Sequence, residues 1–325
     1  MAKEKIIIDT DPGIDDAVAL AIAVFSDKLD VKLITTVAGN VALDKVTSNA
    51  LKLLTFWNKK IPVARGADRP LIEEYIDASH VHGQSGLAGF DFPAPDTSLL
   101  CAEHAVEKMR HVIMAEDKIT LAAIGPLTNI ALLFAMYPEV KPHISRLVMM
   151  GGSLTRGNRG VMSEFNFATD PHAAKIVFDS GVPLVMADLD IGRKASIPGT
   201  DIEKIKGFGK TGAMLYALLK KYRSGTFETG LRMYDSCALA YILKPELFTA
   251  AQVFADIELS GTLTSGCSVV DMDGFCKKRQ IQLFSPMWTF RLSAHGLRKL
   301  YQSAIERVSS VSRQTNTVKI VYQNR

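Results

Sequence analysis

Hydrophobic residues in the first two thirds of the chain fall into short runs that alternate with segments of helical spacing. Most runs end in a turn rich in Gly, Asp or Asn. The pattern predicts strands at residues 5–9, 31–37, 119–124, 146–150 and 183–186, and helices at 15–26, at 43–57 and after residue 129 to about 136. Strands that alternate with helices indicate an α/β fold. We expect an open, mostly parallel but mixed sheet with helices on both faces, of the Rossmann-like type.

The rest of the chain is less regular. Its patterns predict helices at about 212–222, 236–243 and 288–308, strands at 253–259, 268–270 and 280–284, and a polar tail from about 309. No internal repeat, low-complexity tract or linker interrupts the chain. We therefore expect one domain over residues 1–325, with the C-terminal part packed on the same sheet.

Composition narrows the class of protein. Of the 325 residues, 47% are hydrophobic and 22% are charged, which is typical of a globular protein. The net charge of +4 and the lack of Lys/Arg runs argue against binding to nucleic acid or to an anionic membrane. The start of the chain lacks a secretory signal, and the longest apolar run, residues 17–25, is too short to span a bilayer. We expect a cytoplasmic protein.

Four cysteines are scattered along the chain without a CxxC pair or a zinc-like cluster with histidine: Cys101, Cys237, Cys267 and Cys276. This pattern predicts reduced and mostly buried thiols.

Polar residues of unusual density follow the predicted strands. Asp9 and Asp11 end the first strand, and Asp15 and Asp16 begin the first helix. Further polar residues follow later strands: Asn40, Thr128, Asn129, Asn158, Glu164 and Asn166. In open parallel sheets, ligands bind beyond the carboxyl ends of the strands, so we expect the functional site there.

The four aspartates can be explained in two ways. One carboxylate, Asp15 or Asp16, could cap the first helix. Capping uses one carboxylate, however, whereas four lie here around a turn broken by Pro12 and Gly13, and like charges repel. A hard divalent cation accounts for the others, and several carboxylates favour Ca²⁺ over Mg²⁺. We therefore predict a metal site.

An Asp-x-Asp pair after an N-terminal strand also occurs in haloacid-dehalogenase-type phosphatases, with the first Asp as nucleophile. The continuation Pro12-Gly13-Ile14 does not match that class, so a phosphatase is the weaker hypothesis.

The segment DTDPGIDDAVAL at residues 9–20 resembles the signature of the inosine–uridine-preferring nucleoside hydrolase family. The resemblance extends over most of the chain. Further similar segments follow in order: TVAGN at 36–40, HGQSGL at 82–87, GPLTN at 125–129, MMGG at 149–152, GN at 157–158, EFN at 164–166, DP at 170–171, TSG at 264–266 and VVD at 269–271. The first segment together with EFN is the most specific combination.

The resemblance implies the nucleoside hydrolase fold and cleavage of ribonucleosides to ribose and free base. It implies a Ca²⁺ site made by Asp11, Asp16, Asp235 and the carbonyl of Thr128. It also implies a sugar site, in which Asp15 binds the ribose, Asn40 lies beside the metal, Asn158, Glu164 and Asn166 hold hydroxyls, and Met150 lies beneath the ring. Family members are commonly homodimers or homotetramers.

The residue types agree with that chemistry. Loss of the base leaves an oxocarbenium-like ribosyl group, which carboxylates and polar acceptors stabilise. Calcium would activate a bound water, and we expect Asp11 to act as its general base, without a covalent intermediate.

One position departs from the family pattern. Many members carry His immediately before the C-terminal calcium Asp, and that His is taken to protonate the leaving base, whereas this chain has Tyr234. Tyr234 could be the acid, His82 could replace it, or the base could leave without an enzymatic acid. Tyr234 could also merely pack over the base.

A weak acid would favour pyrimidine nucleosides, although the chain is most similar to broad-specificity members. A nucleoside-binding protein with little turnover is the second hypothesis.

Weaker candidates lie elsewhere. Tyr222 could stack on the base or serve in the core or a lid. Asp188 and Asp190 form a second Asp-x-Asp, for which a turn or a local hydrogen bond is expected, and Arg193 with Lys194 is expected to be a charged surface pair.

Overall fold

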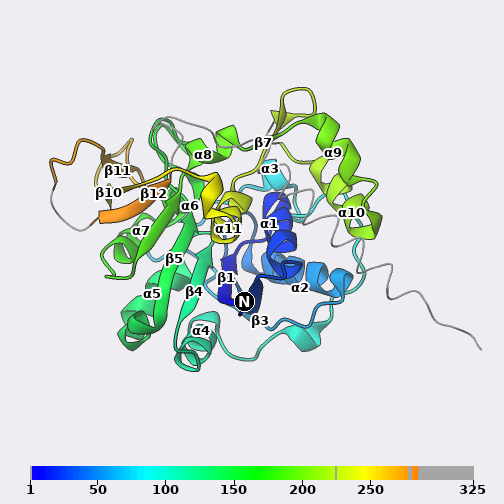
Figure 1. Ribbon diagram of the computed structural model, residues 1–325, viewed down its shortest axis with the longest axis horizontal. Coiled ribbons are helices and arrows are strands. Elements are labelled where there is room, and N and C mark those ends of the chain that lie inside the picture. The colour runs from blue at the N-terminus through cyan, green and yellow to red at the C-terminus, as the bar shows by residue number, and fades with distance from the viewer. Residues whose placement is uncertain (1, 224, 277–279, 285–325) are drawn as a thin grey trace, which may run out of the picture.

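The computed structural model describes residues 2–223, 225–276 and 280–284. The predicted helix at 288–308 and the polar tail from 309 lie outside these residues. Within them, a nine-stranded sheet runs through the molecule in the order β11-β10-β12-β6-β5-β4-β1-β2-β3 (Figure 1). Its strands are β1 (Glu4–Thr10), β2 (Leu29–Thr36), β3 (Val63–Arg65), β4 (Ile119–Ala123), β5 (Ile144–Met150), β6 (Leu184–Ala187), β10 (Ala250–Ile257), β11 (Ser268–Asp271) and β12 (Gln280–Phe284).

Neighbouring strands from β12 to β3 are all parallel, and β10 alone runs antiparallel to both of its neighbours. The prediction of an open, mostly parallel and mixed sheet is therefore confirmed. A separate three-stranded sheet has the order β7-β9-β8 and consists of β7 (Ser196–Ile197), β9 (Gly230–Arg232) and β8 (Gly225–Thr226).

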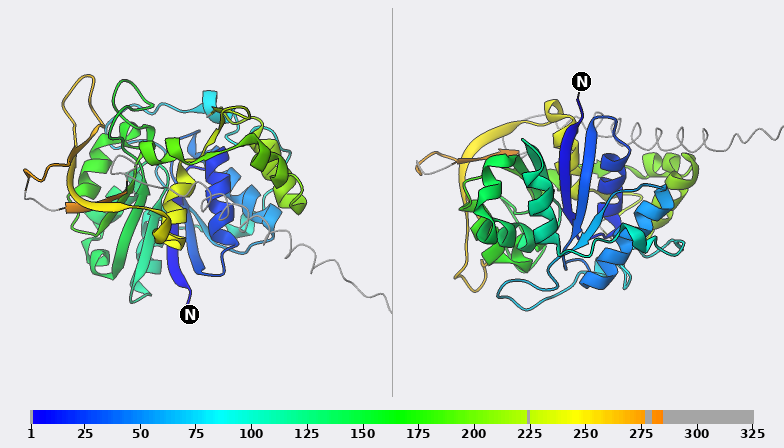
Figure 2. Two further views of the ribbon diagram at one scale, coloured as in Figure 1. Left: turned by 45° about the horizontal axis from the view of Figure 1, so that its top comes forward. Right: turned by 90° about the horizontal axis from the view of Figure 1, so that it is seen from below.

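Helices cover both faces of the large sheet (Figure 2). One face carries α1 (Ile14–Val24), α2 (Leu43–Trp57), α8 (Leu189–Lys194), α9 (Gly199–Ile205), α10 (Gly209–Leu219) and α11 (Asp235–Leu243). The other carries α4 (Ala105–Met114), α5 (Thr128–Met136) and α7 (Pro171–Phe178). Short helices are α3 (Ser79–His82) and α6 (Phe165–Thr169), and 3₁₀ turns lie at Thr97–Leu99, Pro138–His143 and Pro245–Leu247.

The alternation of side chains along β1 divides the core into two. Ile6 and Ile8 pack with the α1 side, whereas Ile7 packs with the α4 and α5 side. All three are buried, as expected for a parallel strand with both faces covered.

Most predicted elements are present, and α2 has the predicted bounds. The predicted helix at 212–222 begins earlier, at Gly209, and ends at Leu219. Sequence patterns missed β3, α4 and α7. Helix α4 buries only four residues, so its apolar stripe is narrow and easily overlooked.

Two predictions about composition can be compared with the structure. All four cysteines are free, but only Cys237 is buried and the other three are half-buried, so the expectation of mostly buried thiols was wrong. Among the helices of the described ranges, none has the length and hydropathy needed to cross a membrane.

Candidate active site

The candidate site lies where the order of strands reverses. The chain passes from β1 outward to β2 and β3, and then returns to place β4 on the other side of β1. The turns after β1 and β4 therefore diverge and leave a crevice at the carboxyl end of the sheet. A cavity of about 360 Å³ opens there, a volume within the range of small-molecule sites.

Ten predicted site residues line this cavity: Asp11, Asp15, Asn40, His82, Met150, Asn158, Glu164, Asn166, Tyr234 and Asp235. Asp16 and Thr128 lie behind its surface and are buried. The structure thus brings together residues separated by more than two hundred positions.

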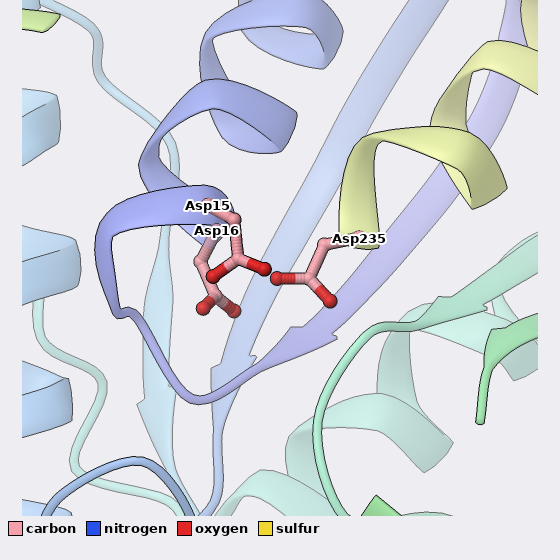
Figure 3. A group of neighbouring side chains, drawn as sticks. All are labelled: Asp15, Asp16 and Asp235. Carbon is pink, nitrogen blue, oxygen red and sulfur yellow. The ribbon is translucent and has the colours of Figure 1, made fainter. Parts of the chain in front are cut away.

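Three carboxylates lie side by side where α1 and α11 begin (Figure 3). Asp15 and Asp16 lie in the first turn of α1, and Asp235 is the first residue of α11. Their ligand atoms lie within 4.8 Å of one another. All three side chains are buried, and such a group of like charges is unfavourable without a compensating cation.

Asp16 also caps α1. Its Oδ2 accepts hydrogen bonds from the backbone N–H of Gly13 at 2.9 Å and from Asn40 Nδ2 at 3.1 Å, and its Oδ1 accepts one from the Thr10 hydroxyl at 2.6 Å. The capping explanation therefore applies to one aspartate. It leaves Asp11 and Asp15 without a structural role of that kind.

The Asp11 carboxylate lines the cavity and has one oxygen that accepts no hydrogen bond from the described residues. Its Oδ2 accepts a hydrogen bond from the backbone N–H of Asn40 at 2.7 Å. Its Oδ1 is buried and has no hydrogen-bond partner among the described residues. A Cβ at Gly39 would lie 2.0 Å from Oδ2, and one at Gly125 would lie 2.7 Å from Oδ1. Both glycines are thus required by the close approach of this carboxylate.

Burial and mutual repulsion change the acidity of the group. Burial raises the pKa of Asp11 and of Asp235 well above the usual range, and repulsion from neighbouring aspartates adds to it. Burial likewise raises the pKa of Asp15, and that of Asp16 to about 6. Without a cation, the group therefore tends to hold protons.

Polar residues of the β5–α6 connection form a second wall. Glu164 is the N-cap of α6, and its carboxylate accepts N–H bonds from Gly152, Asn166 and Phe167. Burial raises its pKa to about 7 in spite of these donors. The Asn166 amide donates to the Met150 carbonyl at 3.1 Å, which leaves its amide oxygen for other partners.

Asn158 is the exposed member of this wall. Its Oδ1 accepts a hydrogen bond from the Phe165 N–H at 2.8 Å, so its NH₂ group is left to donate elsewhere. Met150, at the end of β5, contributes a buried apolar surface between the two walls. Hydroxyl groups of a sugar match this mixture of donors, acceptors and apolar surface.

Aromatic and histidine side chains form the remaining wall. Tyr222 is buried, and its hydroxyl donates to Asp15 Oδ2 at 2.9 Å. Its ring lies 5.6 Å from that of His82, centroid to centroid. Tyr234 is half-buried at the N-cap of α11 and packs over Gly192, where a Cβ would lie 2.1 Å from its Cδ1.

His82 is held as a neutral ring. Its Nδ1 accepts a hydrogen bond from the backbone N–H of Ile14 at 3.0 Å, which places the imidazole proton on Nε2. Burial lowers the pKa of His82 to about 4. A neutral imidazole is a poor acid near pH 7, so the geometry favours His82 as a hydrogen-bond donor to a ligand rather than as a proton source.

Asp9 does not reach the cavity. Its Oδ1 accepts hydrogen bonds from Thr35 and from Asn129 Nδ2, the latter at 2.8 Å, and the side chain is buried. Asn129 also accepts the N–H of Ala67 at 2.8 Å, so the network ties the β1, β2 and β4 ends together. A buried Asp9 cannot attack a phosphate ester, which removes the basis of the phosphatase hypothesis.

Several lining residues were not predicted. Arg159, Arg223 and Arg232 line the cavity, but single arginines carry no sequence signal because most lie on surfaces. The predicted charged surface pair holds for Lys194, which is exposed, but not for Arg193. Arg193 is half-buried and bonds both Asp190 and the Gly157 carbonyl.

Comparisons with known proteins agree with this arrangement. The non-specific ribonucleoside hydrolase RihC of Escherichia fergusonii is 50% identical over 270 residues, which cover 83% of this chain and 88% of the relative. The RihC of Escherichia coli K12 is 49% identical over 269 residues, with the same coverage.

Solved structures share the fold. A purine-preferring ribonucleoside hydrolase from Gardnerella vaginalis superposes with a TM-score of 0.86 at 23% identity, over 95% of this chain and 100% of that chain. A plant nucleoside hydrolase, PpNRh1, superposes with a TM-score of 0.84 at 27% identity, over 93% and 99%. The family model for inosine-uridine preferring nucleoside hydrolases matches residues 6–289. This chain therefore belongs to the inosine-uridine preferring nucleoside hydrolase family.

Proposed function

We propose that this protein hydrolyses the N-glycosidic bond of both purine and pyrimidine ribonucleosides, with Ca²⁺ as its metal. The observation that carries the proposal is the cavity itself. Clustered carboxylates from α1 and α11 line it together with Asn158, Glu164 and Asn166. The broad base specificity is supported by the 50% identity to a non-specific ribonucleoside hydrolase.

The oxygen donors fit a hard divalent cation. Asp11 has a buried oxygen without a partner among the described residues, and the pKa values of four aspartates are raised by burial, with mutual repulsion adding for three of them. Several carboxylates in one place favour Ca²⁺ over Mg²⁺, which keeps more of its waters. We assign the ligands to Asp11, Asp16, Asp235 and the carbonyl of Thr128. When bound, the cation would acidify a water and orient the ribose diol.

The protein residues would divide the remaining work. Asp11 would accept the proton of the attacking water, because its Oδ1 faces no competing donor among the described residues. Asp15, oriented by Tyr222, would accept a hydrogen bond from a ribose hydroxyl. Asn40 would hold Asp11 and Asp16 in place through the bonds it already makes to both.

The sugar would lie over Met150, with its hydroxyls bound by Asn158, Glu164 and Asn166. Carboxylates close to the ring would stabilise the positive charge that develops as the base leaves. We expect direct attack by water, without a ribosyl-enzyme. A mass increase of one ribosyl group on rapidly quenched enzyme would contradict this.

His82 and Tyr234 would contact the departing base. Because His82 is neutral, Tyr234 is the better-placed candidate for proton donation. A phenol is a weaker acid than an imidazolium group. Release of the base with late protonation by water remains the alternative.

The deciding experiment measures free ribose by a reducing-sugar assay. Uridine, cytidine, inosine and adenosine are supplied to the purified protein before and after chelation, with Ca²⁺ or Mg²⁺ added back. We expect ribose from all four, loss on chelation and recovery with Ca²⁺. Tight nucleoside binding without ribose release would instead support a binding protein. A homodimer or homotetramer stays a prediction that size-exclusion chromatography with light scattering can check.

A further inference from the structure

The connection from β5 to α6 carries cavity residues on an extended loop, residues 151–163. Asn158, Arg159 and Gly160 of this loop line the cavity. Residues 155 and 156 are exposed, and Asn158 itself is exposed. A loop with so little buried apolar surface needs other contacts to hold a binding residue in one position.

Asp190, in the first turn of α8, provides such contacts. Its Oδ2 accepts the backbone N–H groups of Leu154 at 2.8 Å and of Thr155 at 3.1 Å. Its Oδ1 accepts the Thr155 hydroxyl and the Arg193 Nη1, the latter at 2.9 Å. One buried carboxylate thus accepts hydrogen bonds from two consecutive backbone N–H groups of the loop. Leu154 and Thr155 precede Asp190 by 36 and 35 residues in the sequence.

Arg193 extends the same connection toward the cavity. While Nη1 binds Asp190, Nη2 donates to the carbonyl of Gly157 at 3.1 Å. Gly157 immediately precedes Asn158. The planar guanidinium can make both bonds at once, whereas an ammonium group cannot make them in the same geometry.

The backbone at Asn158 is then held from both sides. Arg193 binds the carbonyl before it, and the Asn158 N–H donates to the Ser163 carbonyl at 3.1 Å. The Asn158 side chain accepts the Phe165 N–H. These contacts use the Asn158 amide oxygen and leave its NH₂ group as a donor, on a residue that lines the same cavity as the carboxylates.

The Asp190–Arg193 pair is also less exposed than an ordinary surface pair. The side chains are 9% and 29% exposed. Another pair of the same i,i+3 spacing, Asp201–Lys204 on α9, has a lysine side chain that is 59% exposed, and neither residue lines the cavity. The two pairs look alike in sequence, but the first bonds the loop that carries Asn158.

We propose that Asp190 and Arg193 are positioning residues that hold Asn158 against the sugar of the substrate. This rests on the proposed role of Asn158 in sugar binding. Neither residue touches the substrate, and their effect passes through the Gly157–Asn158 backbone. Loss of the pair weakens binding of substrate and transition state alike, so it raises KM and leaves kcat little changed.

The test compares Arg193→Met, Arg193→Lys and the control Lys204→Met, with uridine as substrate. We expect Arg193→Met to raise KM about tenfold, the effect of losing one charge-assisted hydrogen bond at a binding residue. Arg193→Lys keeps the positive charge beside Asp190. We therefore expect it to have the thermal midpoint of the unchanged protein but the raised KM of Arg193→Met. Lys204→Met should change neither. A KM restored by Arg193→Lys would overturn the proposal, because charge alone would then be enough.

A double-mutant cycle separates this proposal from the proposed function. Asn158→Ala alone should raise KM, and adding Arg193→Met to it should then raise KM by less than twofold, because the two changes remove one interaction. Additive effects would overturn the positioning role and leave the sugar-binding role of Asn158 intact. If Asn158→Ala leaves KM unchanged, the proposed sugar contact fails, and with it a positioning role exerted through Asn158.

Discussion

The Tyr222 hydroxyl donates a 2.9 Å hydrogen bond to Asp15 Oδ2, and so joins residues 207 positions apart. The bond orients a buried carboxylate that lines the cavity. We expect Tyr222→Phe to lower kcat/KM for uridine about tenfold, since hydrogen bonds to charged groups contribute ~1.5–3 kcal/mol. Steady-state ribose release measures this. Tyr216→Phe is the control, because Tyr216 makes a 2.8 Å bond to Glu203 on an exposed surface; an equal loss in both variants would argue against a role at the site.

Asp11→Asn removes the proposed general base and one negative charge from the site. We expect turnover to fall by about 10²–10⁴, the usual contribution of general base catalysis, and calcium affinity to fall as well. Calorimetric titration with Ca²⁺ and ribose release measure the two effects. Asp91→Asn, on the exposed surface, should change neither. Normal turnover in Asp11→Asn would mean that another group takes the proton.

Tyr234→Phe tests the source of the proton for the leaving base. We expect turnover of inosine to fall about 10²-fold, at the low end of general acid catalysis. Turnover of p-nitrophenyl riboside should fall much less, because nitrophenolate leaves without protonation. Equal losses on both substrates would remove Tyr234 from the role of acid and leave it as a packing residue over Gly192.

His82→Asn and His82→Ala separate two functions of the ring. Asn can still accept the Ile14 N–H near the position of Nδ1, whereas Ala leaves that buried donor unpaired, at a cost of ~1–3 kcal/mol. We expect only His82→Ala to lower the thermal midpoint strongly. Because the pKa of His82 is about 4, the pH–rate profile between pH 5.5 and 8 should keep its shape in His82→Asn. A lost ionisation near pH 6 to 7 would contradict the neutral ring.

Calcium binding should depend on pH in a defined direction. The pKa of Asp16 is raised to about 6 and those of Asp11 and Asp235 are raised further by burial. A raised carboxyl pKa stabilises the metal-free fold below the unfolded value of about 4, and this stability is lost as pH rises through the folded value. Calcium removes the repulsion, so the gap in thermal midpoint between calcium-saturated and chelated protein should widen from pH 5 to pH 7.5. Asp11→Asn should narrow the gap, and a gap that is constant with pH would contradict the assignment.

Local sequence patterns were sufficient to predict most strands and helices of the sheet and the acidic turn between β1 and α1. Strand β1 and helix α1 follow from an isoleucine run and an apolar helix that begins with two aspartates. The bond between Tyr222 and Asp15 could not be predicted, because it depends on where the segment after α10 passes over α1. The bonds of Asp190 and Arg193 to residues 154–157 could not be predicted for a similar reason, because they join a helix to a loop from elsewhere in the chain; the i,i+3 bond between the two is of the local kind expected for Asp190.

Helices α1 and α11 both begin at the carboxylates and pack against each other. Each helix directs the partial positive charge of its N-terminus toward the same few oxygens. The site is therefore partly neutralised by the backbone before any cation binds, and its assembly coincides with the packing together of two helices that lie far apart in the sequence. Metal binding should therefore slow amide hydrogen exchange throughout the first turns of both helices. The slowing should include residues that are not metal ligands.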